Sequence, residues 1–200
     1  ARDVEYLATY SRARLYLKTA GPDDTLQVAA HCLTRSRPDL VILAGVCRGL
    51  HPEKQSVGDL VLGSALEYVE RDPAALSAGA LRLDPDFEEA YYLLLARLRV
   101  QDRIRTRNEG FLLCHGDLPP SWTLAEDLAK LDPRAVAAAS DRSRVYATAA
   151  RLDPYCAGWA AVKGVAWYGQ HRTSQNDATA AASVADLVVA TAKSTALNYR

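Results

Sequence analysis

The chain has 200 residues with 24 Lys or Arg and 24 Asp or Glu, so its formal net charge is zero. A neutral chain with scattered basic residues has no field to gather polyanions, which argues against nucleic-acid binding. Its apolar stretches, such as residues 40–46 and 185–192, are much shorter than the roughly 20 residues of a membrane-spanning helix, so no membrane contact is expected.

Extended runs and one amphipathic helix alternate through the first half of the chain. Aromatic and β-branched residues predict strands, and apolar residues spaced three to four apart after Asp23 or Asp24 predict a helix. The expected elements are two extended runs or a hairpin at residues 4–10 and 13–19, a helix from Thr25 to near Pro38, a strand covered on both faces at 40–46, and a strand at 59–70.

The second half continues the same alternation after a loop expected at residues 73–85. The expected elements are a helix at 87–100, a strand at 110–115, helices at 124–131 and 141–152, a strand at 158–167, and an Ala-rich helix at 177–197. At least five strands interleaved with at least four helices predict a single α/β domain. Asp-Pro pairs recur along the chain, but their unequal spacing does not fit a tetratricopeptide array.

The cysteines and the N-terminus indicate a reduced compartment. Cysteines at positions 32, 47, 114 and 156 form no C-x-x-C pair, so we expect free thiols, no disulfide framework and no metal site. The first residues lack the order of a signal peptide, which predicts a cytoplasmic protein.

The residues around the expected buried strand carry a resemblance to a known superfamily. Residues 37–50 read RPDLVILAGVCRGL, and residues 57–63 read VGDLVLG. A buried strand, a turn close to G-x-A-G-G-L and a G-D pair that opens the next strand resemble the purine nucleoside phosphorylase and nucleosidase superfamily, which includes the methylthioadenosine and adenosylhomocysteine nucleosidases. Ala20-Gly21-Pro22 before a helix, and residues 161–169 (AVKGVAWYG), resemble two further elements of that superfamily.

The resemblance covers nearly the whole chain from about residue 14. It implies a three-layer α/β/α sandwich with a mixed, mostly parallel central sheet, in one domain over residues 1–200. The superfamily's first strand does not appear before Ala1, and the chain contains no Met. The resemblance further implies a small nucleoside-like ligand, a homodimer or larger assembly, and no cofactor apart from inorganic phosphate as a co-substrate.

The reaction that the resemblance implies is cleavage of an N-glycosidic bond through an oxocarbenium-like transition state. In the superfamily a carboxylate holds the ribose hydroxyls, and an Asp gives a proton to the departing base. Trp167 stands at the position of that Asp, and Ser143 stands at the position of the carboxylate. No catalytic residue is therefore assigned. The candidate ligand-binding residues are Val46, Cys47, Arg48, Gly49, Asp141, Arg142, Ser143 and Trp167.

Each of these residues has a simpler structural interpretation beside the functional one. Trp167 is either a platform for a flat ligand or a packed aromatic at a strand end. Arg48 either grips a phosphate or carboxylate, or is a solvated turn residue. Asp141 fits a helix cap as well as a ligand contact. Asp59 is expected to be a turn residue.

Further polar residues near the expected strand ends are weaker candidates. His115 follows an apolar strand at the pocket rim, and Glu67 and Glu70 are the nearest replacements for the missing carboxylate. Two functions remain open: a divergent enzyme that cleaves a nucleoside or similar glycoside, and a nucleoside-binding sensor or partner domain without turnover.

Overall fold

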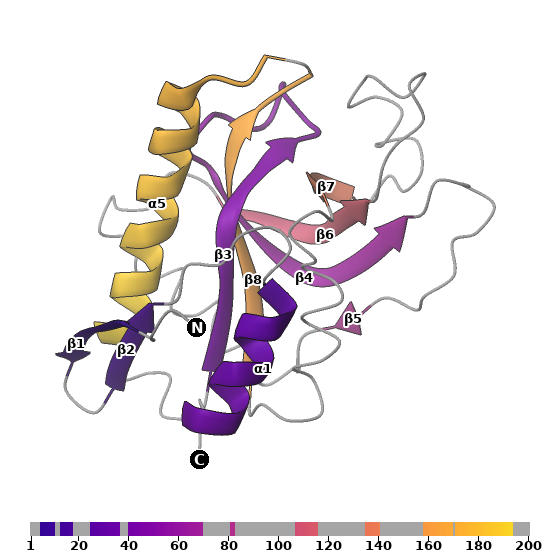
Figure 1. Cartoon of the computed structure of the whole chain (residues 1–200). Coiled ribbons are helices and arrows are strands. Elements are labelled where there is room, and N and C mark those ends of the chain that lie inside the picture. The colour runs from indigo at the N-terminus through magenta and orange to yellow at the C-terminus, as the bar shows by residue number, and fades with distance from the viewer. Residues whose placement is uncertain are drawn as a thin grey trace.

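The structure is a computed structural model (Figure 1). It describes residues 5–10, 13–17, 25–36, 40–69, 81–82, 107–115, 135–140, 158–169 and 171–193. The elements within them are β1 (Glu5–Tyr10), β2 (Ala13–Leu17), α1 (Thr25–Ser36), β3 (Leu40–Gly49), β4 (Leu60–Val69), β5 (Leu81–Arg82), β6 (Arg107–His115), β7 (Ala135–Ser140), β8 (Gly158–Trp167) and α5 (Ser174–Lys193).

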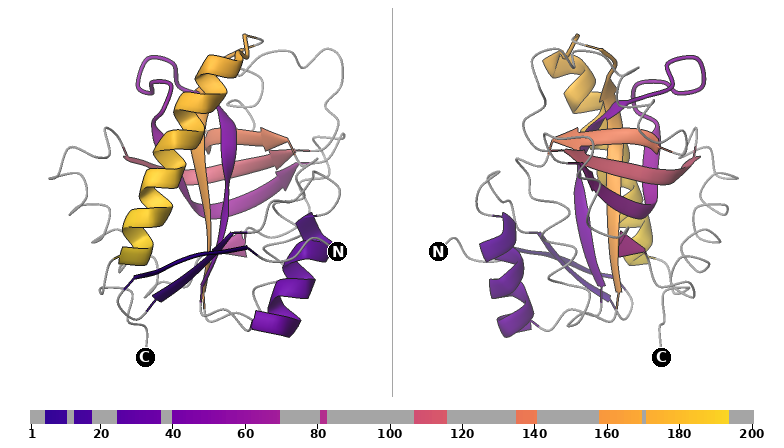
Figure 2. Two further views of the ribbon diagram at one scale, coloured as in Figure 1. Left: turned by 60° about the vertical axis from the view of Figure 1, so that its left-hand side comes forward. Right: turned by 90° about the vertical axis from the view of Figure 1, so that its right-hand side faces the viewer.

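The main sheet is mixed and closes on itself. Its strand order is β5-β4-β6-β7-β3-β8, and an additional pairing joins β8 back to β4. The pairings β4–β6, β6–β7 and β3–β8 are parallel, whereas β3–β7, β4–β8 and β4–β5 are antiparallel. Figure 2 shows β4, β6 and β7 crossing the long axis of β3 and β8. The predicted α/β class with a mixed central sheet is confirmed.

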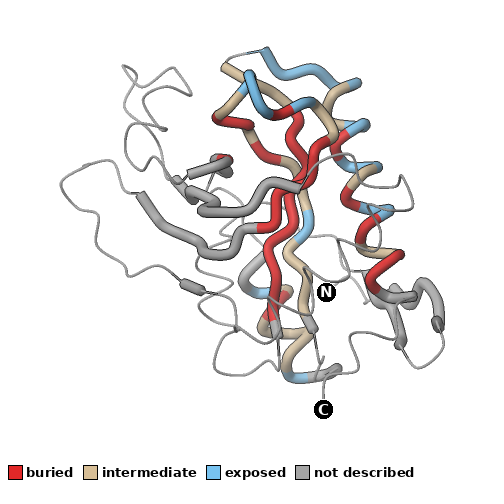
Figure 3. The backbone as a smooth tube through the Cα atoms, turned by 180° about the vertical axis from the view of Figure 1, so that it is seen from behind, coloured by how far each residue is buried: buried red, intermediate tan, exposed pale blue. Residues whose placement is uncertain are grey.

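β8 is the most buried strand among the described residues. It lies between β3, with which it pairs over its whole length, and β4, which pairs with residues 162–164. Every residue from 159 to 166 is buried (Figure 3). A strand with a neighbour on each edge and cover on both faces accommodates a nearly continuous run of apolar residues, as in this segment.

The first half of β3 corrects one prediction. The apolar run at 41–46 was expected to be covered on both faces, but these residues are half-buried and Ala44 is exposed (Figure 3). Among the described elements, α5 packs mainly over β8 and less over β3, so the faces of β3 are only partly covered. One edge of β3 is open as well, because β7 meets it only at Arg48 and Gly49. Along the residues before Arg48, β3 has β8 as its one partner strand in the described part of the chain.

Helix α5 covers the outer face of β8. Its buried residues recur every three to four positions, which is the period of a helix with one apolar face: Ala180, Val184, Leu187 and Ala190. Gly164 makes the close approach possible, since a Cβ there would overlap the carbonyl oxygen of Ala180. The helix begins three residues before the expected Asp177, because Thr173 is the cap: its Oγ1 accepts a hydrogen bond of 3.2 Å from the Asn176 amide.

The other element predictions have mixed outcomes. β1 and β2 pair antiparallel, which is the hairpin among the two expected arrangements. α1 lies where a helix is expected, and β6 begins at Arg107, three residues earlier than expected. The short strand β5 falls within the expected loop, and β7 was not predicted. The expected helices at 87–100, 124–131 and 141–152 lie outside the described residues. No described helix combines the length and apolar character needed to span a membrane.

Candidate functional site

The carboxyl ends of β3 and β8 lie side by side. The strands pair in parallel, with Cys47 opposite Val165 and Arg48 opposite Trp167 across a one-residue irregularity. β3 runs through Gly49, so the expected glycine-rich turn is corrected: its first residues are the last residues of the strand. Such an edge is where open α/β sheets bind their ligands.

Gly49 permits close packing at this edge. A Cβ on Gly49 would overlap the ring of Tyr168 and would lie 2.9 Å from Gln55 Oε1 and 2.9 Å from Val165 Cγ1. A side chain at position 49 would therefore force β3 away from the end of β8. The glycine is required by this approach and not by an unusual backbone angle.

A buried glutamine organises the turn that follows β3. Gln55 is 5% exposed, and its Oε1 accepts hydrogen bonds of 3.1 Å from both the Leu50 and His51 amides. The backbone of the turn is closed by the Lys54 and Gln55 amides, which each donate to the His51 carbonyl at 2.9 Å. The sequence offered no signal for this role of Gln55.

Asp59 is confirmed as a turn residue. It is 3% exposed, and its Oδ2 accepts a hydrogen bond of 2.9 Å from the Ser56 amide. Its backbone carbonyl accepts from the Val165 amide at 2.8 Å, and the Gly58 amide donates to the Val165 carbonyl at 2.8 Å. The start of β4 is thus fastened to β8 beside the candidate site.

Lys163 places a buried cation between two strands. It stands opposite Gly45 of β3 and Val61 of β4, and it is 4% exposed. Its Nζ lies 3.4 Å from the Ala44 carbonyl oxygen and would lie 2.9 Å from a Cβ on Gly45. The absence of a side chain at position 45 therefore makes room for the ammonium group.

Cys47 is inert as a nucleophile. Complete burial raises the pKa of its thiol to about 12, although the positive charge of Lys163 acts in the opposite direction. Since the thiolate is the reactive form of cysteine, the protonated thiol at neutral pH packs as a small apolar group. The prediction of Cys47 as a ligand contact stays a prediction, with packing as its observed role.

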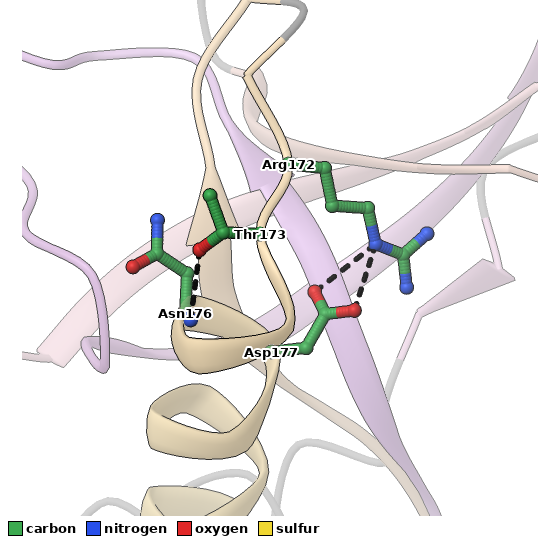
Figure 4. A network of polar contacts seen from close by, with 4 residues as sticks. All are labelled: Arg172, Thr173, Asn176 and Asp177. Atoms are coloured by element: carbon green, nitrogen blue, oxygen red, sulfur yellow. Dashed lines mark hydrogen bonds and ion pairs between the residues drawn. The ribbon is translucent and has the colours of Figure 1, made fainter.

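Trp167 is covered by an arginine that the helix start holds in place. The Arg172 Cζ lies 4.4 Å from the centroid of the Trp167 ring, which is a cation–π stack. The Arg172 Nε donates to both carboxylate oxygens of Asp177, at 3.0 and 2.9 Å (Figure 4). Arg172 is 54% exposed at its side chain, so the stack lies at the surface.

Tyr168 follows Trp167 and turns its hydroxyl inward. The hydroxyl oxygen is buried, and within the described part of the chain it has no hydrogen-bond partner. Burial raises the pKa of Tyr168, and the negative charges of Asp59 and Glu53 raise it further. The phenol is therefore a neutral group at this edge.

The remaining candidates are divided between described and undescribed residues. Val46 and Arg48 lie half-buried at the end of β3, and burial lowers the pKa of Arg48. The triplet at 141–143 and Glu70 lie outside the described residues. Across the ranges that are described, no three His, Cys, Asp or Glu side chains gather as they would around a metal ion.

Two further candidates lie on β4 and β6. β4 carries Glu67 opposite Leu113 of β6, and His115 ends β6 opposite Ser140 of β7. Neither of them pairs with β3 or β8.

Arg172 was missed by sequence reasoning because it stands after the matched motif, in a segment that reads as a linker. The sequence does contain a signal for this contact. An aromatic residue, a cation and an acid follow one another around a single turn, as Trp167, Arg172 and Asp177. Lys163 was noted only as part of a motif.

Solved structures of nucleoside-processing enzymes share this fold. A 5′-methylthioadenosine/S-adenosylhomocysteine nucleosidase from Neisseria meningitidis, in complex with methylthio-immucillin-A, has a TM-score of 0.67 at 17% identity, covering 96% of this chain and 90% of that one. A purine nucleoside phosphorylase from Toxoplasma gondii, in complex with immucillin-H, has a TM-score of 0.68 at 15% identity, covering 98% and 84%.

A futalosine hydrolase mutant from Helicobacter pylori gives a TM-score of 0.66 at 13% identity, covering 94% of this chain and 88% of that one. No protein-family model matches the chain, and no curated protein matches it. At these identities the likeness is one of fold, and the predicted nucleoside phosphorylase-like fold is confirmed.

Proposed function

We propose that the protein binds a purine nucleoside, or a related glycoside, at the carboxyl ends of β3 and β8. The observation that carries the proposal is the register that sets Arg48 beside Trp167 at the edge of a nucleoside phosphorylase fold. An indole offers a flat face to a base, and a guanidinium offers paired donors to a phosphate or carboxylate. Asp141, Arg142 and Ser143 are the further residues that we expect to contact the sugar.

The reaction that we infer is cleavage of the N-glycosidic bond. The bond between the sugar C1′ and the base nitrogen breaks, the electron pair leaves with the base, and water or inorganic phosphate attacks the oxocarbenium-like sugar. Trp167 cannot give a proton to the base as an Asp would, because its indole N–H is a hydrogen-bond donor only. Base departure must therefore be assisted by another group at this edge.

A second candidate function is ligand binding without turnover. The replacement of two acidic positions by Trp167 and Ser143 favours it, since general acid catalysis and the fixing of two ribose hydroxyls both need a carboxyl group. A sensor of this kind would keep the stacking surface and lose only the chemistry.

Incubation with a panel of nucleosides separates these functions. Adenosine, inosine, methylthioadenosine and adenosylhomocysteine are each incubated with the protein, with and without inorganic phosphate, and free base is measured by chromatography. Release of base without phosphate indicates a hydrolase, and release only with phosphate indicates a phosphorylase. Saturable quenching of tryptophan fluorescence with no base release supports the sensor.

The control variant for this experiment is Trp167→Phe. It keeps an aromatic face but removes the reporting indole, so the quenching signal is expected to fall while binding measured by calorimetry persists. Quenching that survives in Trp167→Phe comes from Trp122 or Trp159 and argues against a ligand at the carboxyl end of β8. If none of the four nucleosides binds or reacts, the proposal of a nucleoside site fails.

We further propose that the chain works as a homodimer or larger assembly and needs no cofactor beyond inorganic phosphate. Light scattering measures the mass in solution. A monomer at the working concentration of the activity assay contradicts the first statement, and activity that requires an added cofactor contradicts the second.

A further inference from the structure

We propose that the Arg172 side chain is an autoinhibitory cover on the candidate site. Its guanidinium occupies the face of Trp167 on which a base would stack, so a ligand binds there only after the guanidinium has left. The inference rests on the proposed nucleoside binding at the ends of β3 and β8, and it adds a regulation of that site. Any change that releases Arg172 from the ring is expected to raise the affinity for the ligand.

The cover lies on the accessible face of the ring. The Arg172 Cζ is 4.4 Å from the centroid of the Trp167 ring, and a stacked base would have its own ring centre about 4.5–7 Å from that centroid. The guanidinium therefore stands where the base would lie. Trp167 is half-buried at the end of a strand whose residues 159–166 are buried, whereas the Arg172 side chain is 54% exposed. The covered face is thus the one that a ligand would approach from solvent.

Asp177 holds the cover in place. The Arg172 Nε donates to both oxygens of the Asp177 carboxylate, at 3.0 and 2.9 Å (Figure 4). Asp177 is fixed in the first turn of α5, where its amide donates to the Thr173 carbonyl at 3.0 Å. The carboxylate thereby stabilises the covered state of the ring, and its effect on a ligand passes through Arg172.

The cover can leave the ring without disturbing the fold. The side chains of Arg172 and Asp177 are 54% and 32% exposed, so rotation of the arginine carries its charge into water and leaves no buried group without a partner. A cation–π stack at an exposed position favours the covered state by about 2- to 5-fold, and an exposed ion pair favours it by up to about 5-fold. A ligand that binds only the uncovered fraction has an apparent affinity lowered in proportion.

The first test compares the wild type with Arg172→Ala by calorimetry on the full chain, with inosine and with adenosine. We expect Arg172→Ala to bind both nucleosides about 3- to 30-fold more tightly, which is the product of the two contributions above. The matched control is Lys54→Ala. It removes an exposed cation from the turn after β3 and changes the net charge equally, so its affinity should equal that of the wild type.

A double-mutant cycle tests the role of Asp177. Asp177→Asn is expected to tighten nucleoside binding by up to about 5-fold in the wild type and to have no effect in Arg172→Ala, because Asp177 acts through the arginine. The control is Asp186→Asn, an exposed acid on the same helix, which should leave the affinity unchanged in both backgrounds. An equal effect of Asp177→Asn with and without Arg172 would contradict its role as the holding group.

A third measurement needs no ligand. Acrylamide quenches the fluorescence of accessible tryptophans, so Arg172→Ala is expected to be quenched more steeply than the wild type. The same substitution in a Trp167→Phe background should make no difference, because Trp122 and Trp159 are common to both proteins. Quenching that is unchanged by Arg172→Ala would show that the arginine does not cover the ring in solution.

The outcomes separate this inference from the proposed function. Nucleoside binding that is equally tight in the wild type and in Arg172→Ala overturns the cover and leaves the nucleoside site intact. Weaker binding by Arg172→Ala also overturns it, because the base would then stack on the guanidinium and not in its place. Binding by Arg172→Ala alone is the strongest support. Absence of binding by both proteins contradicts the proposed function, and the inference falls with it.

Discussion

Gly49 is a residue whose size alone matters to the site. Its missing side chain leaves room for the Tyr168 ring and the Gln55 amide at the junction of β3 and β8. We expect Gly49→Ala to lower the free energy of unfolding by about 1–3 kcal/mol, the usual range for an over-packed methyl group. Urea unfolding measures the change, and weaker nucleoside binding should accompany it because Arg48 is displaced.

The matched variant is Gly169→Asn, at a glycine with φ of 56° and nothing within 4 Å of a Cβ. Asn tolerates this left-handed conformation, so little change in the free energy of unfolding is expected. A Gly49→Ala protein as stable as the wild type would mean that Tyr168 does not lie against Gly49.

Tyr168 carries a buried hydroxyl without a partner among the described residues, which is unfavourable for the fold. Removing it in Tyr168→Phe is expected to leave the free energy of unfolding unchanged or to raise it, by up to about 1 kcal/mol, at neutral pH. A decrease of more than about 1 kcal/mol, measured by urea unfolding, would show that the hydroxyl has a partner that stabilises the fold.

Alkaline pH provides a second measurement on the same variant. The pKa of Tyr168 is raised in the folded protein by burial and by neighbouring negative charges, whereas the unfolded chain has the ordinary value near 10. Above that pH the unfolded state loses its proton first, so the free energy of unfolding falls as pH rises. We expect a smaller fall in Tyr168→Phe between pH of about 8 and about 11. Equal slopes would show that Tyr168 titrates normally.

At the scale of elements, the strands of the main sheet could be predicted where β-branched or aromatic residues form them. β4 and β8 were expected with nearly the observed bounds. β7 was not, because its sequence AVAAAS is mostly alanine, which favours helices in isolation and becomes a strand here through pairing with β6 and β3. Local preference does not contain that tertiary information.

The candidate site was predictable at its strand ends and not beyond them. Arg48, Gly49 and Trp167 were expected to contact one ligand. The register places Arg48 opposite Trp167, and the ligand contact itself stays a prediction. The cation over Trp167 was not predicted. The order Trp167, Arg172, Asp177 hints at it, but the stack itself depends on the positive φ of Gly169 and on where α5 begins.

The contact between β8 and α5 depends on one glycine. A Cβ on Gly164 would overlap the backbone of Ala180, and a backbone cannot move aside as a flexible side chain can. We expect Gly164→Ala to lower the free energy of unfolding by about 3 kcal/mol or more, at or above the upper end of the usual range for over-packing. The control is Ala181→Ser on the exposed side of α5, where a change within about 0.5 kcal/mol is expected from helix propensity. Similar losses in both variants would contradict the close packing.

At the scale of the whole molecule, the strands form the closed path β4-β6-β7-β3-β8-β4, in which β8 lies between β3 and β4. The path closes through pairs between residues 60–62 and 162–164, reinforced by the two backbone hydrogen bonds that Val165 makes with Gly58 and Asp59. The candidate site lies just past this junction. The part of the molecule that positions Trp167 is therefore also the part most protected from opening.

This arrangement predicts an uneven pattern of amide hydrogen exchange. Residues 162–164 of β8 have strand partners on both edges, and their amides are expected to exchange only when the whole domain unfolds. Alternate amides of β3 at 41–46 face away from β8, where no described strand pairs with them, and should exchange about 100-fold faster or more. Exchange measured by NMR distinguishes the two strands. Equal protection of both would mean that the first half of β3 has a second partner strand.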